Sequence, residues 1–115
     1  MSDVYTEAVQ RLSRVSGVRG ALLVDAEAGL PVMSELAEGV SGTAVAALAS
    51  SLFRRTAQAS DTAGFGKLVT MQMEADNGHV VAVDAGEIII VVIAEKDAQL
   101  GLVRLEAHRA AESLA

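Results

Sequence analysis

Two histidines, His79 and His108, are the side chains of this sequence best suited to bind a metal ion or to transfer a proton. Neither has a second histidine at the His-x-x-x-His spacing of a zinc site, and the chain has no cysteine. We therefore interpret both histidines as exposed or capping residues, and we predict no metal site.

Two pairs of carboxylates, Asp25 with Glu27 and Asp84 with Glu87, are candidates for acid–base catalysis. That role requires burial or a charged neighbour that shifts the pKa of one carboxyl group. Both pairs instead lie in predicted turns, where acidic residues are common and solvated. We therefore predict no catalytic residue and no enzymatic activity.

Two glycine-rich segments, EGVSGT (38–43) and GFGK (64–67), resemble phosphate-binding loops in composition. The first precedes a predicted helix, whose N-terminus is able to bind phosphate. A phosphate loop, however, ends in Gly-Lys-Ser/Thr before a helix, and neither segment has that pattern. We interpret the first as a helix cap and the second as a helix stop, and we predict no cofactor.

The composition limits the class of protein further. A chain of 115 residues fits a single domain covering residues 1–115. Its formal net charge of −6 argues against nucleic-acid binding, which usually requires a basic patch. The absence of cysteine fits a reducing compartment, and the N-terminal MSDVYTEAVQ lacks the features of a signal peptide, so we predict a cytoplasmic location.

The elements that position these residues follow from hydrophobic periodicity. We predict three helices, beginning at Ser2 or Asp3, at Ser41 or Thr43, and at Asp97, and ending near Val15, Thr62 and Leu114. The predicted strands are 21–24, 30–36, 67–75, 79–85 and 88–94. The order is α-β-β-α-β-β-β-α, with links too short for parallel crossovers. This predicts an α+β fold with a five-stranded, mostly antiparallel sheet.

Two of the strands carry information about their place in the sheet. Residues 88–94 are apolar throughout, but they are too few to span a membrane, which takes about 20 residues in a helix. A strand that is apolar on both faces belongs at the centre of a sheet with helices on both sides. Pro31 has no N–H to donate, so its strand should lie at an edge or begin at Pro31.

The second predicted helix has a wider apolar arc than one contact with a sheet requires. We expect one face to pack on the sheet: Val45, Leu48, Ala49, Leu52, Thr56, Ala59 and Ala63. A second stripe, formed by Ala46, Phe53 and Ala57, would then need another cover. Because the strand of residues 67–73 also looks like a sheet edge, a second copy of the chain would cover both features.

Two segments, GVRGALLVDAEAGLPV (17–32) and DAQLGLVRLEA (97–107), resemble the first hairpin and the last helix of the Roadblock/dynein-light-chain family, in particular its bacterial MglB-like branch. The resemblance implies a sheet with the second helix on one face and the other two helices on the opposite face. It also implies a homodimer in which second helices pair and third strands join. The interface residues expected on this basis are Ala46, Ala49, Phe53, Ala57, Val69 and Met71.

The resemblance further implies a cytoplasmic adaptor or scaffold that regulates a Ras-like small GTPase and has no active site of its own. Arg54, Arg55 and Gln58 on the second helix are the candidate partner-binding residues, and we favour contact over catalysis for them, although a solvated helix face is the simpler explanation. An alternative is a small-ligand sensor or structural scaffold subunit of the profilin or sensory-domain type. Leu102 and Leu105 are expected either to pack under the first helix or to form an exposed patch.

Overall fold

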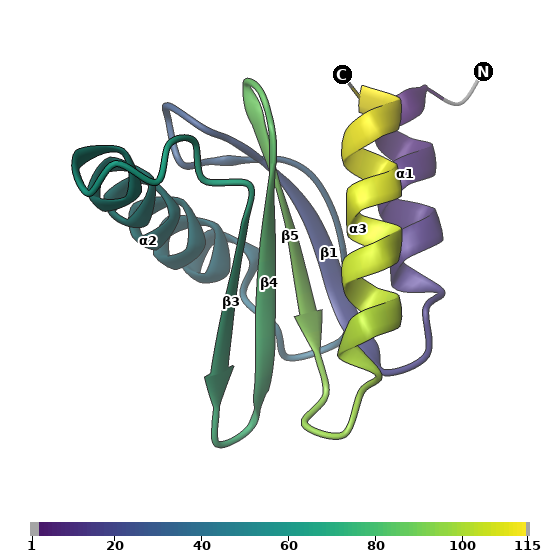
Figure 1. Cartoon of the computed structure of the whole chain (residues 1–115). Helices are drawn as coiled ribbons and strands as arrows, with labels where there is room; N and C mark the ends of the chain where they lie inside the picture. Colours follow the sequence, from purple (N-terminus) through teal and green to yellow (C-terminus); the bar gives the residue numbers. More distant parts are fainter. Residues whose placement is uncertain (1–2, 115) are drawn as a thin grey trace.

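A computed structural model describes residues 3–114 of the chain and confirms the predicted order of elements. The helices and strands are α1 (Val4–Ser13), β1 (Val18–Asp25), β2 (Pro31–Leu36), α2 (Gly42–Thr62), β3 (Thr70–Ala75), β4 (Gly78–Ala85), β5 (Ile88–Ala94) and α3 (Leu100–Leu114). The strands form one antiparallel sheet in the order β2-β1-β5-β4-β3. Figure 1 shows α2 on one face of this sheet and α1 with α3, side by side, on the other.

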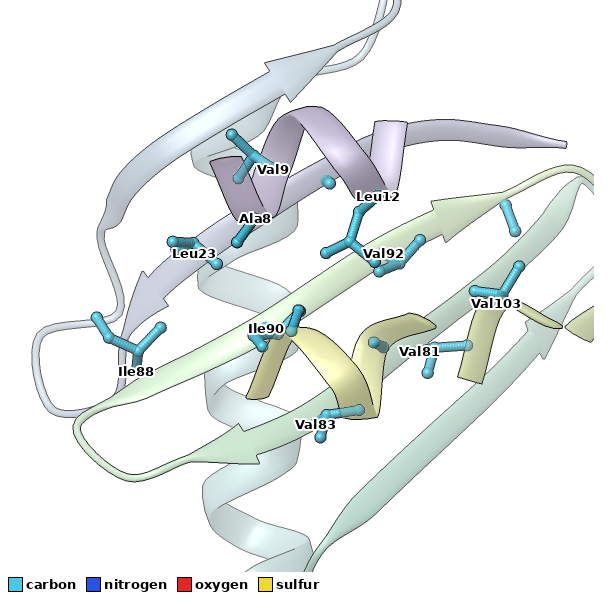
Figure 2. Close-up of a cluster of buried hydrophobic side chains, with 14 residues drawn as sticks. Ala8, Val9, Leu12, Leu23, Val81, Val83, Ile88, Ile90, Val92 and Val103 are labelled. Carbon is cyan, nitrogen blue, oxygen red and sulfur yellow. The ribbon is translucent and has the colours of Figure 1, made fainter. Parts of the chain in front are cut away.

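The apolar strand β5 lies at the centre of the sheet, as its composition predicts. Its alternate side chains enter two separate cores. Ile90 and Val92 pack with α1 and α3, while Ile89 and Val91 pack with α2. Figure 2 shows the first of these cores, in which Leu12 of α1 and Val103 of α3 lie over the strands. Helices are therefore required on both faces to remove this one strand from water.

Local signals explain where the first two helices begin. The Asp3 carboxylate accepts a hydrogen bond from Thr6 N–H at 2.8 Å, and this contact lowers the pKa of Asp3 below its ordinary value. Ser2, the other predicted cap, lies outside the described residues. For α2 the cap is Ser41, whose Oγ accepts from Ala44 N–H at 3.3 Å, rather than Thr43.

The prediction that Asp97 caps the last helix is wrong. The first helical carbonyl is that of Gln99, which accepts from Val103 N–H at 3.1 Å, and α3 begins at Leu100. Residues 95–98 instead turn the chain beside the α1–β1 loop, where Glu95 N–H donates to Gly17 O at 2.7 Å. This additional turn is not visible in hydrophobic periodicity.

The two edges of the sheet also match their sequence signals. Pro31 begins the edge strand β2, as predicted, and the pairing of β1 with β2 shifts in register beside it, where Leu23 pairs with Met33 and Val24 with Pro31. The other edge is β3, which pairs with β4 alone among the described strands. It begins at Thr70 rather than at Lys67, because residues 63–69 form the link from α2.

Candidate functional site

The side of α2 that packs on the sheet matches the one expected from the sequence only in part, because it includes the expected Ala49 but also Ala46 and Phe53. Ala46, Ala49 and Phe53 are buried against the sheet, and Phe53 is only 6% exposed. Ala57, on the same stripe, is half-buried. The predicted second stripe is thus covered by the chain's own strands. Ala46, Ala49 and Phe53 are therefore not free to meet a second copy.

The neighbouring apolar stripe of α2 is covered only in part, since Val45 packs against the core on this face of the sheet. We call it the outer stripe; its members are Val45, Leu48, Leu52 and Ala59. Leu48 is 49% exposed and Ala59 is exposed, whereas Val45 and Leu52 are half-buried. The sequence-based expectation that this stripe faces the sheet is therefore correct for Val45 and wrong for the exposed Leu48 and Ala59. The helix does have more apolar surface than its own sheet covers, but the uncovered part is the outer stripe.

The outer stripe is continuous with the free edge of the sheet. Thr56, at the border of the stripe, donates from Oγ1 to Met71 Sδ in β3 at 3.6 Å. Val69, immediately before β3, is 56% exposed, and Met71 is half-buried. Met71 thus lies next to α2, and the exposed Val69 lies two residues before it at the same edge of the sheet. Outer stripe, Val69 and β3 together make one surface.

The backbone of β3 offers unpaired hydrogen-bonding groups along this surface. Asp84 N–H of β4 donates to Val69 O at 3.0 Å, so Val69 directs its carbonyl toward β4. In an antiparallel ladder alternate residues bond to the same neighbour. Thr70, Gln72 and Glu74 therefore direct their backbone groups outward, where a further strand can pair with them.

The opposite face of β3 is attached to α3 by polar side chains. Thr70 Oγ1 and His108 Nε2 are 2.9 Å apart, and Arg104 Nη1 donates to Gln72 Oε1 at 3.3 Å. His108 is half-buried, so its expected exposure is only partial. These contacts fix the edge strand from behind and leave its outer rim open.

His79 is not exposed, so the first of its two expected roles, exposed or capping, is wrong. It is 5% exposed, and its Nε2 lies 3.1 Å from Lys96 O, a distance at which the ring N–H donates to the carbonyl. Its buried Nδ1 has no hydrogen-bond partner within residues 3–114. The ring holds the β5–α3 link in place. The pattern of strand residues around His79 does not predict that its side chain is buried.

The three polar residues predicted to bind a partner lie on the solvent side of α2. They differ in whether their side chains already bind another part of the chain. Arg54 Nη1 donates to Glu27 O in the β1–β2 turn at 3.0 Å, so this guanidinium attaches the helix to its own hairpin. Arg55 and Gln58 are exposed and form no side-chain hydrogen bond or ion pair among the described residues. Arg55 and Gln58 are therefore the more available pair.

Leu102 and Leu105 form an exposed patch on α3, the second of the two alternatives. They are 41% and 46% exposed, so α1 does not cover them. The α1 helix instead packs along the neighbouring flank of α3, around Glu106, Arg109 and Ala110.

The cavity between the two helices on one face of the sheet is small for a ligand site. The hollow between α1 and α3 holds about 80 Å³, whereas ligand pockets usually hold roughly 300–1,000 Å³. A larger hollow of about 430 Å³ lies in the β1–β2 and β4–β5 turn region and is lined by Asp25, Ala26, Glu27 and Glu87. Within residues 3–114 no group of His, Asp or Glu side chains is arranged to hold a metal ion, and no helix has the length and hydrophobicity needed to span a membrane.

Comparisons with known proteins agree with this geometry. The model of the Roadblock/LC7 domain family matches residues 5–94. An uncharacterized protein of Methanocaldococcus jannaschii is 35% identical over 114 residues, which cover 99% of this chain and 96% of that protein.

Solved structures resemble the chain over its whole length. The gliding protein MglB of Thermus thermophilus superposes with a TM-score of 0.84 at 24% identity, covering 100% of this chain and 90% of that one. A structure described as MglB with tetrameric arrangement gives a TM-score of 0.84 at 25% identity, with the same coverage of both chains. The fold is therefore that of MglB.

Proposed function

Because the chain belongs to the Roadblock/LC7 domain family, we propose that it is a homodimeric, non-enzymatic adaptor of the cytoplasm that binds and regulates a Ras-like small GTPase. The observation that carries the proposal is the surface made by the outer stripe of α2 and the free rim of β3. This surface combines exposed aliphatic side chains with unpaired backbone groups, which is the combination that a second copy satisfies.

A two-fold axis perpendicular to the sheet, beside the middle of β3, describes the dimer. It pairs two β3 strands antiparallel and keeps both α2 helices on the same face of the joined sheet. Each outer stripe then meets its counterpart, with Leu48 and Leu52 at the contact. Val69 and Met71 remain interface residues in this arrangement, while Ala46, Ala49 and Phe53 support the helix from below. The tetrameric arrangement described for MglB supports self-association as a property to expect of this fold.

The partner surface is the polar side of α2 that the dimer leaves exposed. Gln58 lies there without a partner among the described residues, next to Arg54, which is already attached to the β1–β2 turn. Arg55, also without a partner among them, lies at the border between this side and the outer stripe, one turn from Leu52. A cationic group in a chain of net charge −6 suits an acidic patch on a second protein. The two copies in the dimer present this group twice.

The experiment is a binding assay with purified Ras-like GTPases from the source organism, each loaded with GDP or with a non-hydrolysable GTP analogue. We expect one of them to bind the dimer, and the Arg55→Glu variant to bind at least about 10-fold more weakly, because a charge reversal at an interface costs over about 1.4 kcal/mol. Arg14→Glu, on the opposite layer, serves as the control. Absence of binding by every GTPase in both nucleotide states would remove the partner from the proposal.

A further inference from the structure

One part of the sheet on the α2 side is left bare. The helix begins over β1 and β2, where a Cβ placed on Gly42 would lie 2.8 Å from Leu36 Cδ1. It ends near β3, where Thr56 contacts Met71. Because α2 crosses the sheet obliquely (Figure 1), it does not cover the strands near the β3–β4 hairpin.

A groove of about 320 Å³ occupies this bare region. Its apolar lining includes Met73 of β3, Val80 of β4 and Ile93 of β5, all of them half-buried, with Ala75 at the hairpin end. These four residues lie on adjacent strands and face the α2 side. The groove is therefore an apolar depression that extends to β3, the strand at the free edge of the sheet.

The side chain of Phe65 is the most exposed large apolar group in the described part of the chain, at 86%. The backbone that carries it is firmly held. Phe65 N–H donates to Ser60 O at 2.9 Å, and Ser60 Oγ donates to Gly66 O at 2.8 Å. Gly64 and Gly66 take φ values of +84° and +85°, which other residues rarely adopt. The loop thus fixes the backbone position from which the exposed aromatic ring extends into water.

The link that carries Phe65 comes from α2, and Leu68 in this link packs into the core on the α2 side, so the link and the groove belong to the same side of the sheet but to opposite ends of β3. Phe65 precedes the strand, whereas the groove surrounds its last residues, Met73 and Ala75. A two-fold axis beside the middle of β3 exchanges the two ends of the strand without changing the face. It therefore carries Phe65 of one copy toward the groove of the other.

We propose that in the dimer each copy inserts Phe65 into the groove lined by Met73, Val80 and Ile93 of its partner. The inference rests on the proposed dimer and names the residue that anchors it. An apolar cavity of roughly 150 Å³ is known to admit benzene, so the groove has room for a phenyl ring. Buried aromatic anchors at fixed positions dominate many interfaces, because little side-chain entropy is lost when they dock. The occupant is therefore a second copy of this chain, and the contact is made twice.

The first test compares Phe65→Ala with Leu30→Ala in sedimentation equilibrium. Leu30 is 59% exposed on the distant β1–β2 turn, so it is a large exposed apolar residue like Phe65 but lies far from the interface. We expect Phe65→Ala to raise the dimer dissociation constant about 100- to 1,000-fold, because two anchors are lost per dimer, and Leu30→Ala to leave it unchanged. Neither change should alter the thermal unfolding of the monomer. Equal dissociation constants for Phe65→Ala and the wild type would overturn the proposal.

The second test locates the contact by chemical crosslinking. The chain has no cysteine, so a short bifunctional maleimide reacts only with introduced thiols. We expect Phe65→Cys mixed with Ala75→Cys to give a crosslinked pair, and Phe65→Cys alone to give none. Gln72→Cys, near the axis, should crosslink with itself. If Gln72→Cys crosslinks but the mixture does not, the proposed role of Phe65 is wrong and the proposed dimer is retained. If Gln72→Cys does not crosslink either and the wild type is monomeric, both fail.

Discussion

The two faces of the sheet are covered to different extents. On one face α1 and α3 lie side by side and enclose a large core, from Leu12 to Val103, within the single chain (Figure 2). On the other face α2 alone crosses the strands, with a smaller core around Phe53 and the half-buried groove residues beyond it. The difference indicates a division of roles: the two-helix face stabilises the subunit, and the one-helix face provides the surface for assembly.

The contacts of β3 follow the same division. Toward α3 the strand is fixed by the Thr70–His108 and Gln72–Arg104 contacts. Toward α2 it has the side-chain contact between Thr56 and Met71, and its outer rim has no neighbouring strand in the described residues. An edge strand held rigidly from one side is a template of fixed shape, which reduces the entropy lost when another strand pairs with it.

The largest expected effect separates stability from assembly at Phe53. Phe53→Ala removes a buried ring from the small core and should destabilise the chain by about 3–5 kcal/mol. If Phe53 is a core residue, the decrease in the free energy of unfolding, measured by chemical denaturation, should not depend on protein concentration. A loss that appears only at concentrations where the wild type is dimeric would return Phe53 to the interface and invalidate the assignment of the outer stripe.

A matched pair of leucines compares the outer surfaces of the two layers. Leu48 on α2 and Leu105 on α3 are 49% and 46% exposed. Leu48→Glu places two like charges near the two-fold axis and should weaken the dimer at least about 100-fold, or roughly 2.7 kcal/mol. Leu105→Glu should leave it intact. The measurement is molar mass by light scattering over a dilution series; dissociation by Leu105→Glu instead would place the interface on the other layer.

The smallest expected effect is a difference between α1 and α2 in how the stability of the helix start depends on pH. The cap of α1 is the carboxylate of Asp3, whose pKa is lowered by the Thr6 N–H, whereas the cap of α2 is the hydroxyl of Ser41, which does not titrate. A lowered pKa contributes stability above the unfolded value of 3.8, and this contribution is lost as the pH falls through the folded value. We expect slightly faster amide exchange in α1, but not in α2, from this cause in that acidic range.

Asp3→Asn provides the control for this pH effect. Asparagine also caps helices but carries no titrating group, so the acid-dependent component of exchange in α1 should disappear. If the variant and the wild type show the same pH dependence, the cap of α1 is not its source.

The fold was predictable from the sequence because each signal acts locally. The apolar run at 88–94 has to be central, Pro31 has to begin an edge strand, and the Asn77-Gly78 turn joins β3 to β4 as a hairpin. These constraints leave few sheet orders. The α1 helix ends at Ser13 rather than near Val15, a small difference of the kind expected at helix ends.

The orientation of α2 was not predictable in the same way. Both of its stripes are apolar, so periodicity does not decide between Leu48 and Phe53 as the residue that faces the sheet. The small Ala46 and Ala49 allow the helix to approach the strands closely, and the ring of Phe53 fills the remaining space. The burial of His79 and the late start of α3 depend on the β5–α3 link, which is a tertiary feature without a periodic signal.

The unequal edges of the sheet have a consequence for stoichiometry. When two β3 strands join, the outer rims of the combined sheet are both β2. There Pro31 lacks a backbone donor, and the pairing with β1 skips Val32 of β2. A third copy finds no straight template on either side. The sheet can therefore add one further strand at β3 but cannot continue to grow at β2, so the dimer does not extend into fibrils.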